Sequence, residues 1–312
     1  MKRKFFYVFI SFFFLTGVAV YFFLNKISST KLFFPQKIIK SEKEADKLFP
    51  EAYFSIFNYH QQFLDVYGEL IAKKKININQ KKVLIIIDSH SDIYLNNFHI
   101  EKNKKNDGNW INSLLSRYDD IEEIYWVLPE VTKGEDLKSR FWDSPITMNH
   151  GLVFRSGPAK IELFVNEKTG KICFPGSHCS GGRKVIVHKR LLDDSFWSEL
   201  RNREVILTID DDFFIYDVKG SFGLDEGELK KPDDFSLTEE KIKEKLQVLM
   251  NHLNNYQIKP IFISCARSID GYIKEEYLPL MDNFCCFLAK NSKTEIDGVF
   301  LHQCQVGDFD FK

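Results

Sequence analysis

The chain has 312 residues, 44% of them hydrophobic, which is enough to bury a substantial core. The 43 Lys and Arg residues nearly balance 44 Asp and Glu residues, so the formal net charge of −1 does not indicate a nucleic-acid-binding protein, and we expect no nucleic-acid partner. Aromatic residues make up 15% of the chain and only 9 residues are Pro, which excludes a disordered or low-complexity protein.

Residues 5–24 read FFYVFISFFFLTGVAVYFFL and contain no charged residue. As a helix they would span about 30 Å, the thickness of a bilayer core. Basic residues at positions 2–4 precede this segment and fewer follow it, so the positive-inside rule predicts a single-pass anchor over residues 1–24, with the N-terminus cytoplasmic and the large domain extracytoplasmic. A cleaved signal peptide is the alternative, but its apolar stretch is usually shorter and ends in small residues.

The polar residues 25–47 are expected to form a tether, and residues 48–312 an α/β domain. An extracytoplasmic domain would permit its cysteines to pair, although buried free thiols are an equal alternative. Cys173 and Cys179 are close enough in sequence to close a small loop, but spacing alone leaves the pairing open. The six cysteines are at positions 173, 179, 265, 285, 286 and 304.

Short apolar runs alternate with amphipathic stretches along the domain, as in strands that are buried on both faces and connected by helices. Residues 237–256 are predicted to form a helix with Ser236 as its N-cap, and Glu275 to Lys290 a second helix. This alternation predicts a three-layer α/β/α fold with a mainly parallel sheet and ligands at the carboxyl ends of the strands. The predicted strands include residues 83–87, 124–128, 185–187, 205–209 and 261–263.

Two of these predicted strands end in potential metal ligands. The run VLIIIDSHSD places Asp88, His90 and Asp92 after a strand, and VILTIDDDFF places Asp210 and Asp212 after another, with the aspartate between them pointing elsewhere. Buried carboxylates are costly unless they are paired or bind a cation. An oxygen-rich set with some nitrogen suits Mn²⁺, or alternatively Zn²⁺ or Fe²⁺, whereas simple strand-end caps are the competing interpretation.

Together these segments resemble a family related to arginases, within the ureohydrolase superfamily that also contains deacetylase-like amidohydrolases. The superfamily motifs are D-x-H-x-D and D-x-D, and some members of the related family are peptide arginases. The resemblance covers roughly residues 50–290, the length of a domain, over which the motifs occur in the same order as in the family. It rests on residues 87–92, 109–111, 208–214, 263–268 and 270–272.

The resemblance implies an arginase/deacetylase-like fold with two divalent metal ions, Mn²⁺ being favoured. It implies that Asp88 and Asp210 bridge the ions, that His90 and Asp212 complete one of them, and that Asp92 helps to bind the other. A further histidine normally comes from upstream. His60 is the candidate, with an ordinary helix-surface histidine as the alternative.

Such a binuclear site can activate water for attack on an electron-poor carbon. The resemblance implies that this carbon belongs to a guanidino group, with urea released, or to an amide. Asp92 would orient the nucleophile and move a proton, and His178, in a Gly-rich loop, is a candidate proton shuttle. The function predicted is therefore a membrane-anchored hydrolase of a linear C–N bond, acting on a peptide or small molecule with a guanidino or amide group.

The substrate is expected to differ from free arginine. Arginases carry a glutamate at the end of a late strand that contacts the guanidinium, whereas residues 264–267 here read SCAR. Asp270, Glu275 and Glu276 are candidates for contacting a cationic substrate, although solvated helix-cap acids are the simpler interpretation. Two alternatives stay open: a single-metal deacylase of the same fold, and a non-catalytic tethered binding module.

Overall fold

A computed structural model describes residues 47–88, 92–93, 110–128, 159–166, 171–173, 182–215, 238–267, 269 and 274–293. The chain divides into two compact units, residues 1–43 and 44–312, and every described residue belongs to the second. The predicted membrane anchor and nearly all of the tether lie outside the described residues. Among the residues that are described, no helix is both long enough and apolar enough to cross a membrane.

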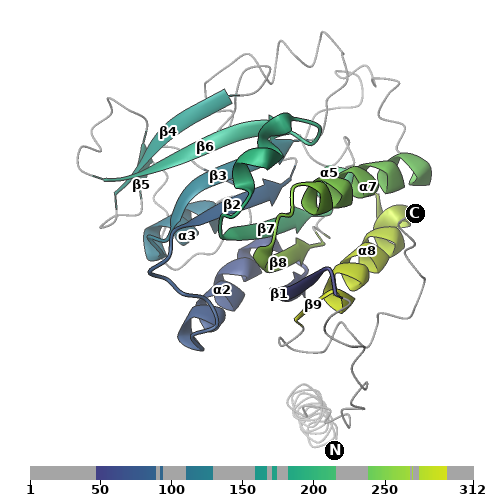
Figure 1. The fold of residues 1–312 in the computed structure, drawn as a ribbon, viewed down its shortest axis with the longest axis horizontal. Coiled ribbons are helices and arrows are strands. Elements are labelled where there is room, and N and C mark those ends of the chain that lie inside the picture. The colour runs from purple at the N-terminus through teal and green to yellow at the C-terminus, as the bar shows by residue number, and fades with distance from the viewer. Residues whose placement is uncertain are drawn as a thin grey trace, which may run out of the picture. The chain divides into compact units, whose positions relative to one another are not determined.

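The described strands form one nine-stranded sheet in the order β5-β4-β6-β3-β2-β7-β8-β1-β9 (Figure 1). Neighbouring strands are parallel except at one edge, where β4 pairs antiparallel with β5 and β6. The prediction of an α/β fold with a mainly parallel sheet is therefore confirmed. The strands are β1 (Phe49–Phe57), β2 (Lys82–Ile87), β3 (Ile121–Leu128), β4 (Ala159–Asn166), β5 (Lys171–Cys173), β6 (Arg183–Leu191), β7 (Val205–Asp210), β8 (Pro260–Ala266) and β9 (Ser292–Lys293).

Helices cover both faces of this sheet. One buried hydrophobic cluster contains side chains of α2 and α3, and a second contains side chains of α5, α7 and α8. In Figure 1 these two groups of helices lie on opposite sides of the strands. The helical elements are η2 (His60–Gln62), α2 (Phe63–Ala72), α3 (Trp110–Arg117), η5 (Ser195–Leu200), α5 (Asp212–Ile215), α7 (Glu239–Asn255), η7 (Glu275–Tyr277) and α8 (Leu278–Lys290).

The position of the central strand β2 explains why its sequence is apolar at successive positions, without alternation of apolar and polar residues. Val83, Ile85 and Ile87 belong to the cluster on the α7 and α8 face, whereas Leu84 and Ile86 belong to the cluster on the α2 and α3 face. Successive side chains of a strand point to opposite faces, so a strand covered on both faces needs apolar residues at every position. The same rule accounts for β7, which is buried throughout.

Three details of the predicted elements need correction. Helix α7 begins at Glu239 and its N-cap is Thr238, whose side-chain oxygen accepts a hydrogen bond from the Lys241 amide at 3.3 Å, so Ser236 is not the cap. The second predicted helix begins as the 3₁₀ turn η7 and becomes α-helical only at Leu278. The sequence pattern also missed β1, because its burial alternates imperfectly and two of its residues face solvent.

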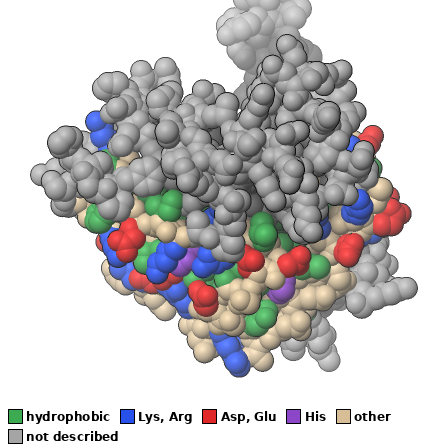
Figure 2. Space-filling model, turned by 90° about the horizontal axis from the view of Figure 1, so that it is seen from above, with side chains coloured by type: hydrophobic (Ala, Val, Ile, Leu, Met, Phe, Trp, Pro, Cys, Tyr) green, Lys and Arg blue, Asp and Glu red, His purple; other side chains and the backbone are tan. Residues whose placement is uncertain are grey.

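The described surface in Figure 2 carries acidic and basic side chains that are interspersed, with hydrophobic side chains scattered among them. This mixture matches the near balance of charges in the sequence. The described part of this face therefore shows no large patch of a single charge sign.

Candidate metal centre

The register of the parallel strands brings two predicted ligands together. Ile87 at the end of β2 pairs with Ile209 of β7, so Asp88 and Asp210, the next residue on each strand, emerge side by side. Both are at the carboxyl edge of the sheet and both are buried. In parallel sheets this edge is where ligands bind, because the loops that follow the strands can diverge there.

Asp92 reaches the same place by a route that the sequence pattern did not predict. Strand β2 ends at Ile87, and Asp92 has a left-handed backbone with φ of 50°. Aspartate adopts this conformation more readily than most residues, and outliers of this kind cluster at functional sites. The indole Nε1 of Trp110, the first residue of α3, donates a hydrogen bond to Asp92 Oδ2 and holds the carboxylate toward the cluster.

The second motif converges through a strand-to-helix turn. Asp210 ends β7 and Asp212 begins α5, and the backbone amide of Asp212 donates to Asp210 Oδ1 at 3.1 Å. Asp211 differs from both, because its fully buried carboxylate has no hydrogen-bond partner among the described residues. Burial, with Asp210 and Asp282 nearby, raises the pKa of Asp211 well above its ordinary value.

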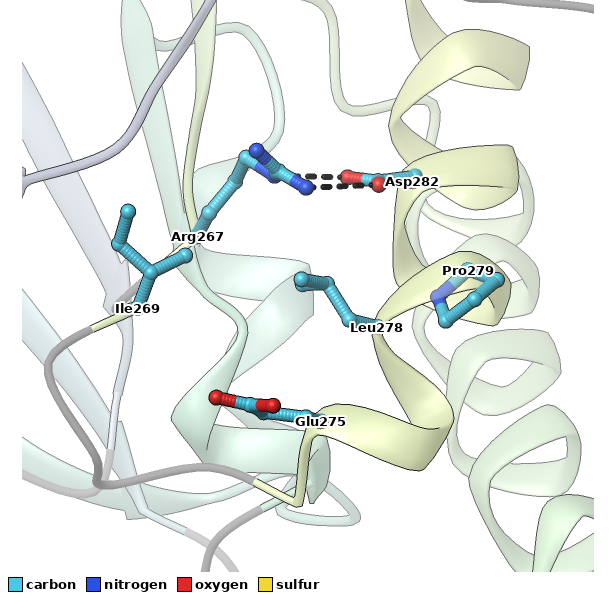
Figure 3. A pocket seen from close by; sticks show the side chains of 6 residues that line it. All are labelled: Arg267, Ile269, Glu275, Leu278, Pro279 and Asp282. Atoms are coloured by element: carbon cyan, nitrogen blue, oxygen red, sulfur yellow. Dashed lines mark hydrogen bonds and ion pairs between the residues drawn. The ribbon is translucent and has the colours of Figure 1, made fainter.

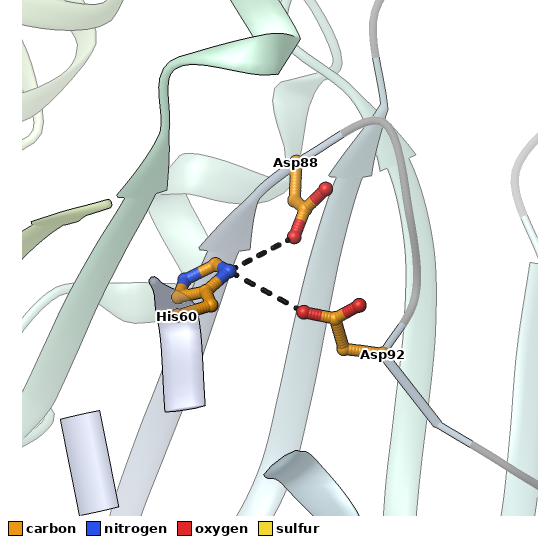
Figure 4. A group of neighbouring side chains, drawn as sticks. All are labelled: His60, Asp88 and Asp92. Carbon is orange, nitrogen blue, oxygen red and sulfur yellow. Dashed lines mark ion pairs between the residues drawn. The ribbon is translucent and has the colours of Figure 1, made fainter. Parts of the chain in front are cut away.

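His60 lies at the centre of this group. It begins η2 after β1, and its Nδ1 lies 3.3 Å from Asp88 Oδ2, 3.3 Å from Asp92 Oδ2 and 3.1 Å from Asp210 Oδ2. Figure 4 shows the carboxylates of Asp88 and Asp92 both pointing at the imidazole. The other ring nitrogen, Nε2, is 2.7 Å from Thr208 Oγ1. The alternative of a helix-surface histidine is excluded, because His60 is buried.

The charges of the cluster explain the protonation of His60. Burial by itself would lower the pKa of His60, but hydrogen bonds to Asp210, Asp88 and Asp92 outweigh it and raise that pKa well above the ordinary value. The raised pKa favours a protonated His60 whenever no cation lies among these carboxylates. A single proton offsets only part of the desolvation free energy of several buried carboxylates, because each such charge costs several kcal/mol to desolvate.

The donor atoms fall into two groups, each able to hold a metal ion. His60, Asp88 and Asp92 form one group, and Asp88, Asp210 and Asp212 form the other; within each group the ligand atoms lie within 4.8 Å of one another. Asp88 belongs to both groups. Carboxylate oxygens with one imidazole are a donor set that suits divalent ions, so the residues fit a metal site.

Five of the predicted ligands thus meet, whereas two predicted residues cannot be placed: His90 and His178 lie outside the described residues. Sequence reasoning missed two supporting residues. Thr208 is a polar residue within the buried strand β7, two positions before Asp210. A polar residue at such a position could have been predicted to support the site. The role of Trp110 depends on where α3 packs, which no local pattern reveals.

The cysteines divide into two kinds. Cys173 and Cys286 are disulfide-bonded, with partners outside the described residues. Cys265 and Cys285 are free and buried, and burial raises the pKa of both thiols. The two free thiols are therefore poor nucleophiles, because the reactive form of cysteine is the thiolate.

Comparison with known proteins places the chain in no family: no family model matches the sequence, and no curated protein matches it significantly.

Proposed function

We propose that this protein is a binuclear metal-dependent hydrolase of a linear C–N bond, of the arginase/deacetylase-like fold, that acts on the guanidino group of arginine within peptides or proteins. The observation that supports it most is the pair of buried ligand groups that share Asp88 at the carboxyl edge of the sheet. A carboxylate that belongs to both ligand groups would hold two ions side by side, which is the arrangement of two-ion sites. The order of the two aspartate motifs in the sequence supports the same reaction class.

One ion would be held by His60, Asp88 and Asp92, and the other by Asp88, Asp210 and Asp212. The prevalence of carboxylate oxygen favours Mn²⁺, with Zn²⁺ or Fe²⁺ as substitutes. Two such ions supply Lewis-acid activation of water and of the substrate carbon when bound.

The chain's own residues would orient the reaction. Asp92 has a side-chain exposure of 9% against 1% for Asp88, so it is the more accessible carboxylate for a substrate or a water molecule. Trp110 holds the Asp92 carboxylate in place, and a carboxylate so placed can accept a proton from the attacking water. His178, which lies in a Gly-rich stretch of the sequence, is our candidate for delivering a proton to the leaving amine.

We propose also that residues 5–24 anchor the protein in a lipid bilayer, with the domain on the extracytoplasmic side. The disulfides at Cys173 and Cys286 support this location, because disulfides persist in oxidising compartments and are rare in the cytosol.

The test uses the full-length protein in detergent micelles, stripped of metal with a chelator and titrated with Mn²⁺. We expect two equivalents to bind, and each bound ion to raise the stability of the fold by about 3 kcal/mol at a Mn²⁺ concentration 100-fold above its Kd. Urea release from an N-acetylated arginine peptide should depend on that loading.

The double variant Asp88→Asn plus Asp210→Asn should lose both the thermal shift and urea release. Asp119→Asn changes an exposed aspartate remote from the cluster and is the matched control. One equivalent of Zn²⁺ with amide hydrolysis and no urea would replace the proposal by a single-metal deacylase. Failure of any divalent ion to bind would leave a non-catalytic module.

A further inference from the structure

A hollow in the described surface lies at the same edge of the sheet as the metal centre. Its volume is about 540 Å³, within the range of small-ligand sites. Figure 3 shows that its walls come from the end of β8, from η7 and from the first turns of α8. The described residues that line it are Arg267, Ile269, Glu275, Leu278, Pro279 and Asp282.

The hollow lies at the end of β8, next to the strand β7 that carries Asp210 of the metal centre, but on the opposite face of the sheet. Arg267 follows Ala266, which pairs with Asp210 of the cluster. The Arg267 side chain binds Asp282 of α8, whereas His60 stacks on Trp110 of α3, on the other face. A ligand that reaches both sites would therefore place one of its groups in the hollow and a different group at the metal centre.

The hollow has one carboxylate that is not compensated. Arg267 donates from Nε and Nη2 to the two carboxylate oxygens of Asp282, at 2.9 Å each, and from Nη1 to Asn58 Oδ1 at 3.3 Å. This bidentate pair neutralises itself and leaves Arg267 little capacity for an anion. Glu275 is exposed and makes no ion pair within the described parts of the chain, so the described lining of the hollow carries one uncompensated negative charge.

The remaining walls are apolar. Ile269 is 37% exposed, a large side chain left in contact with water, and Leu278 points toward it (Figure 3). Pro279, the next residue of α8, also lines the hollow. Apolar walls beside a single carboxylate match a long aliphatic stem that ends in a cation, because such a side chain buries its methylene groups and keeps its charge near the solvent.

From these features we infer that the hollow binds the side chain of a lysine or arginine in a peptide, close in sequence to the arginine whose guanidino group lies at the metal centre. This inference rests on the proposed function and adds a preference for substrates with two neighbouring basic residues. Successive side chains of an extended peptide point in opposite directions. A peptide lying along this edge could therefore place neighbouring side chains on the two faces of the sheet.

The test measures binding to the full-length, Mn²⁺-loaded protein by fluorescence polarisation. The probes are labelled five-residue peptides with citrulline at the centre, so that they are not consumed, and with either lysine or norleucine at each flanking position in turn. An exposed ion pair contributes up to about fivefold in affinity, so at one position lysine should bind about fivefold tighter than norleucine. Added salt should reduce this preference.

Glu275→Gln should abolish the preference for lysine, whereas Glu276→Gln, which changes a neighbouring exposed carboxylate outside the hollow, should keep it. Equal affinity for lysine and norleucine at every position, no binding at millimolar peptide, or a preference retained in Glu275→Gln would each overturn the inference. A preference without urea release from the arginine peptides would refute the proposed hydrolysis and leave the binding site standing. Urea release without any preference for lysine would refute the binding site in the hollow and leave the proposed hydrolysis standing.

Discussion

At the scale of single residues, His60 is the most constrained side chain of the cluster. Its Nδ1 faces three carboxylates and its Nε2 contacts Thr208, so both ring nitrogens are engaged. The raised pKa of His60 favours a proton on Nδ1, the atom that would bind a cation. Proton and metal therefore compete for the same atom, and this competition makes two properties measurable.

The first property is the dependence of metal affinity on pH. Because the carboxylates raise the pKa of His60, we expect Mn²⁺ to displace a proton from it, and the affinity to fall as the pH falls. Calorimetric titration in two buffers of different ionisation enthalpy measures the protons released. His60→Gln should bind Mn²⁺ more weakly and release fewer protons; identical proton release from both proteins would contradict this assignment.

The same pKa shift predicts how the chelated protein responds to pH. The folded-state pKa of His60 lies above its unfolded value, so the stabilisation is fully present below the unfolded pKa of about 6.5 and is lost as pH rises through the raised pKa. Thermal unfolding of the chelated full chain from pH 6 upward should show this loss. The slope should be smaller in His60→Gln.

Thr208 is expected to be a positioning residue for His60. Its hydroxyl, 2.7 Å from Nε2, fixes the ring so that Nδ1 points into the cluster. Removal of such a supporting hydrogen bond typically lowers metal affinity 10- to 100-fold, so Thr208→Val should show that loss in a Mn²⁺ titration. Thr208→Ser keeps the hydroxyl and should bind nearly as the wild type does. Equal affinities for all three proteins would remove Thr208 from this role.

At the scale of elements, the two ends of β2 contain opposite kinds of buried charge. At the carboxyl end Asp88 contributes to a cluster suited to a cation. At the amino end Lys82 is fully buried, with its Nζ 3.0 Å from Asp120 Oδ2, and the Tyr67 hydroxyl donates to the same oxygen. This second group has its cation already in place, which indicates a structural rather than a ligand-binding role.

Breaking the Lys82 group should therefore affect stability and leave metal binding alone. Lys82→Met leaves Asp120 buried without its cation, which typically costs 3–5 kcal/mol, measurable by urea denaturation. The exposed Lys81→Met is the control and should change stability by less than about 0.5 kcal/mol. A loss of Mn²⁺ stoichiometry in folded Lys82→Met would show that the two ends of β2 are coupled.

At the scale of the whole molecule, the domain has a covalent as well as a hydrophobic framework. Buried clusters cover both faces of the sheet, and disulfides join Cys173 of β5 and Cys286 of α8 to residues outside the described parts. The remaining free thiols of the described chain, Cys265 and Cys285, are buried in one of those clusters. Both are therefore shielded from reagents while the domain is folded.

This arrangement predicts a thiol count. The unreduced full-length protein should react with a maleimide at no cysteine in the native state and at two, Cys265 and Cys285, after denaturation. Reduction should expose all six cysteines and lower the free energy of unfolding by 2–5 kcal/mol for each disulfide lost. Four or more reactive thiols in the unreduced, denatured protein would contradict the disulfides and weaken the extracytoplasmic proposal.

Much of the sheet could be predicted from sequence because its central strands are buried on both faces. Apolar runs such as those in β2 and β7 have only one common explanation when they alternate with helical patterns. Peripheral elements were harder: β1 and the β4–β5 hairpin are partly exposed, and their identity depends on which neighbour they pair with. Long-range pairing leaves little trace in a local pattern.

The ligand types in the candidate site followed from the sequence, but their geometry did not. Asp88, Asp210 and Asp212 could be predicted because they lie where buried strands end: Asp88 follows β2, Asp210 ends β7 and Asp212 is two residues further on. The left-handed turn at Asp92, the indole of Trp110 and the hydroxyl of Thr208 became visible only through packing. His60 is the clearest case, since as a lone histidine near a helix it has no local signal for burial.

The sequence by itself therefore determined the fold class, the near-neutral charge and the kinds of atoms available at the strand ends, because periodicity and composition are local properties. Only the tertiary structure decided that His60 faces three carboxylates, that Asp88 belongs to two ligand groups, and that Glu275 rather than Arg267 provides the unpaired charge of the neighbouring hollow. Those relations join residues far apart in the chain, and they exist only once the register of the parallel strands has aligned the strand ends.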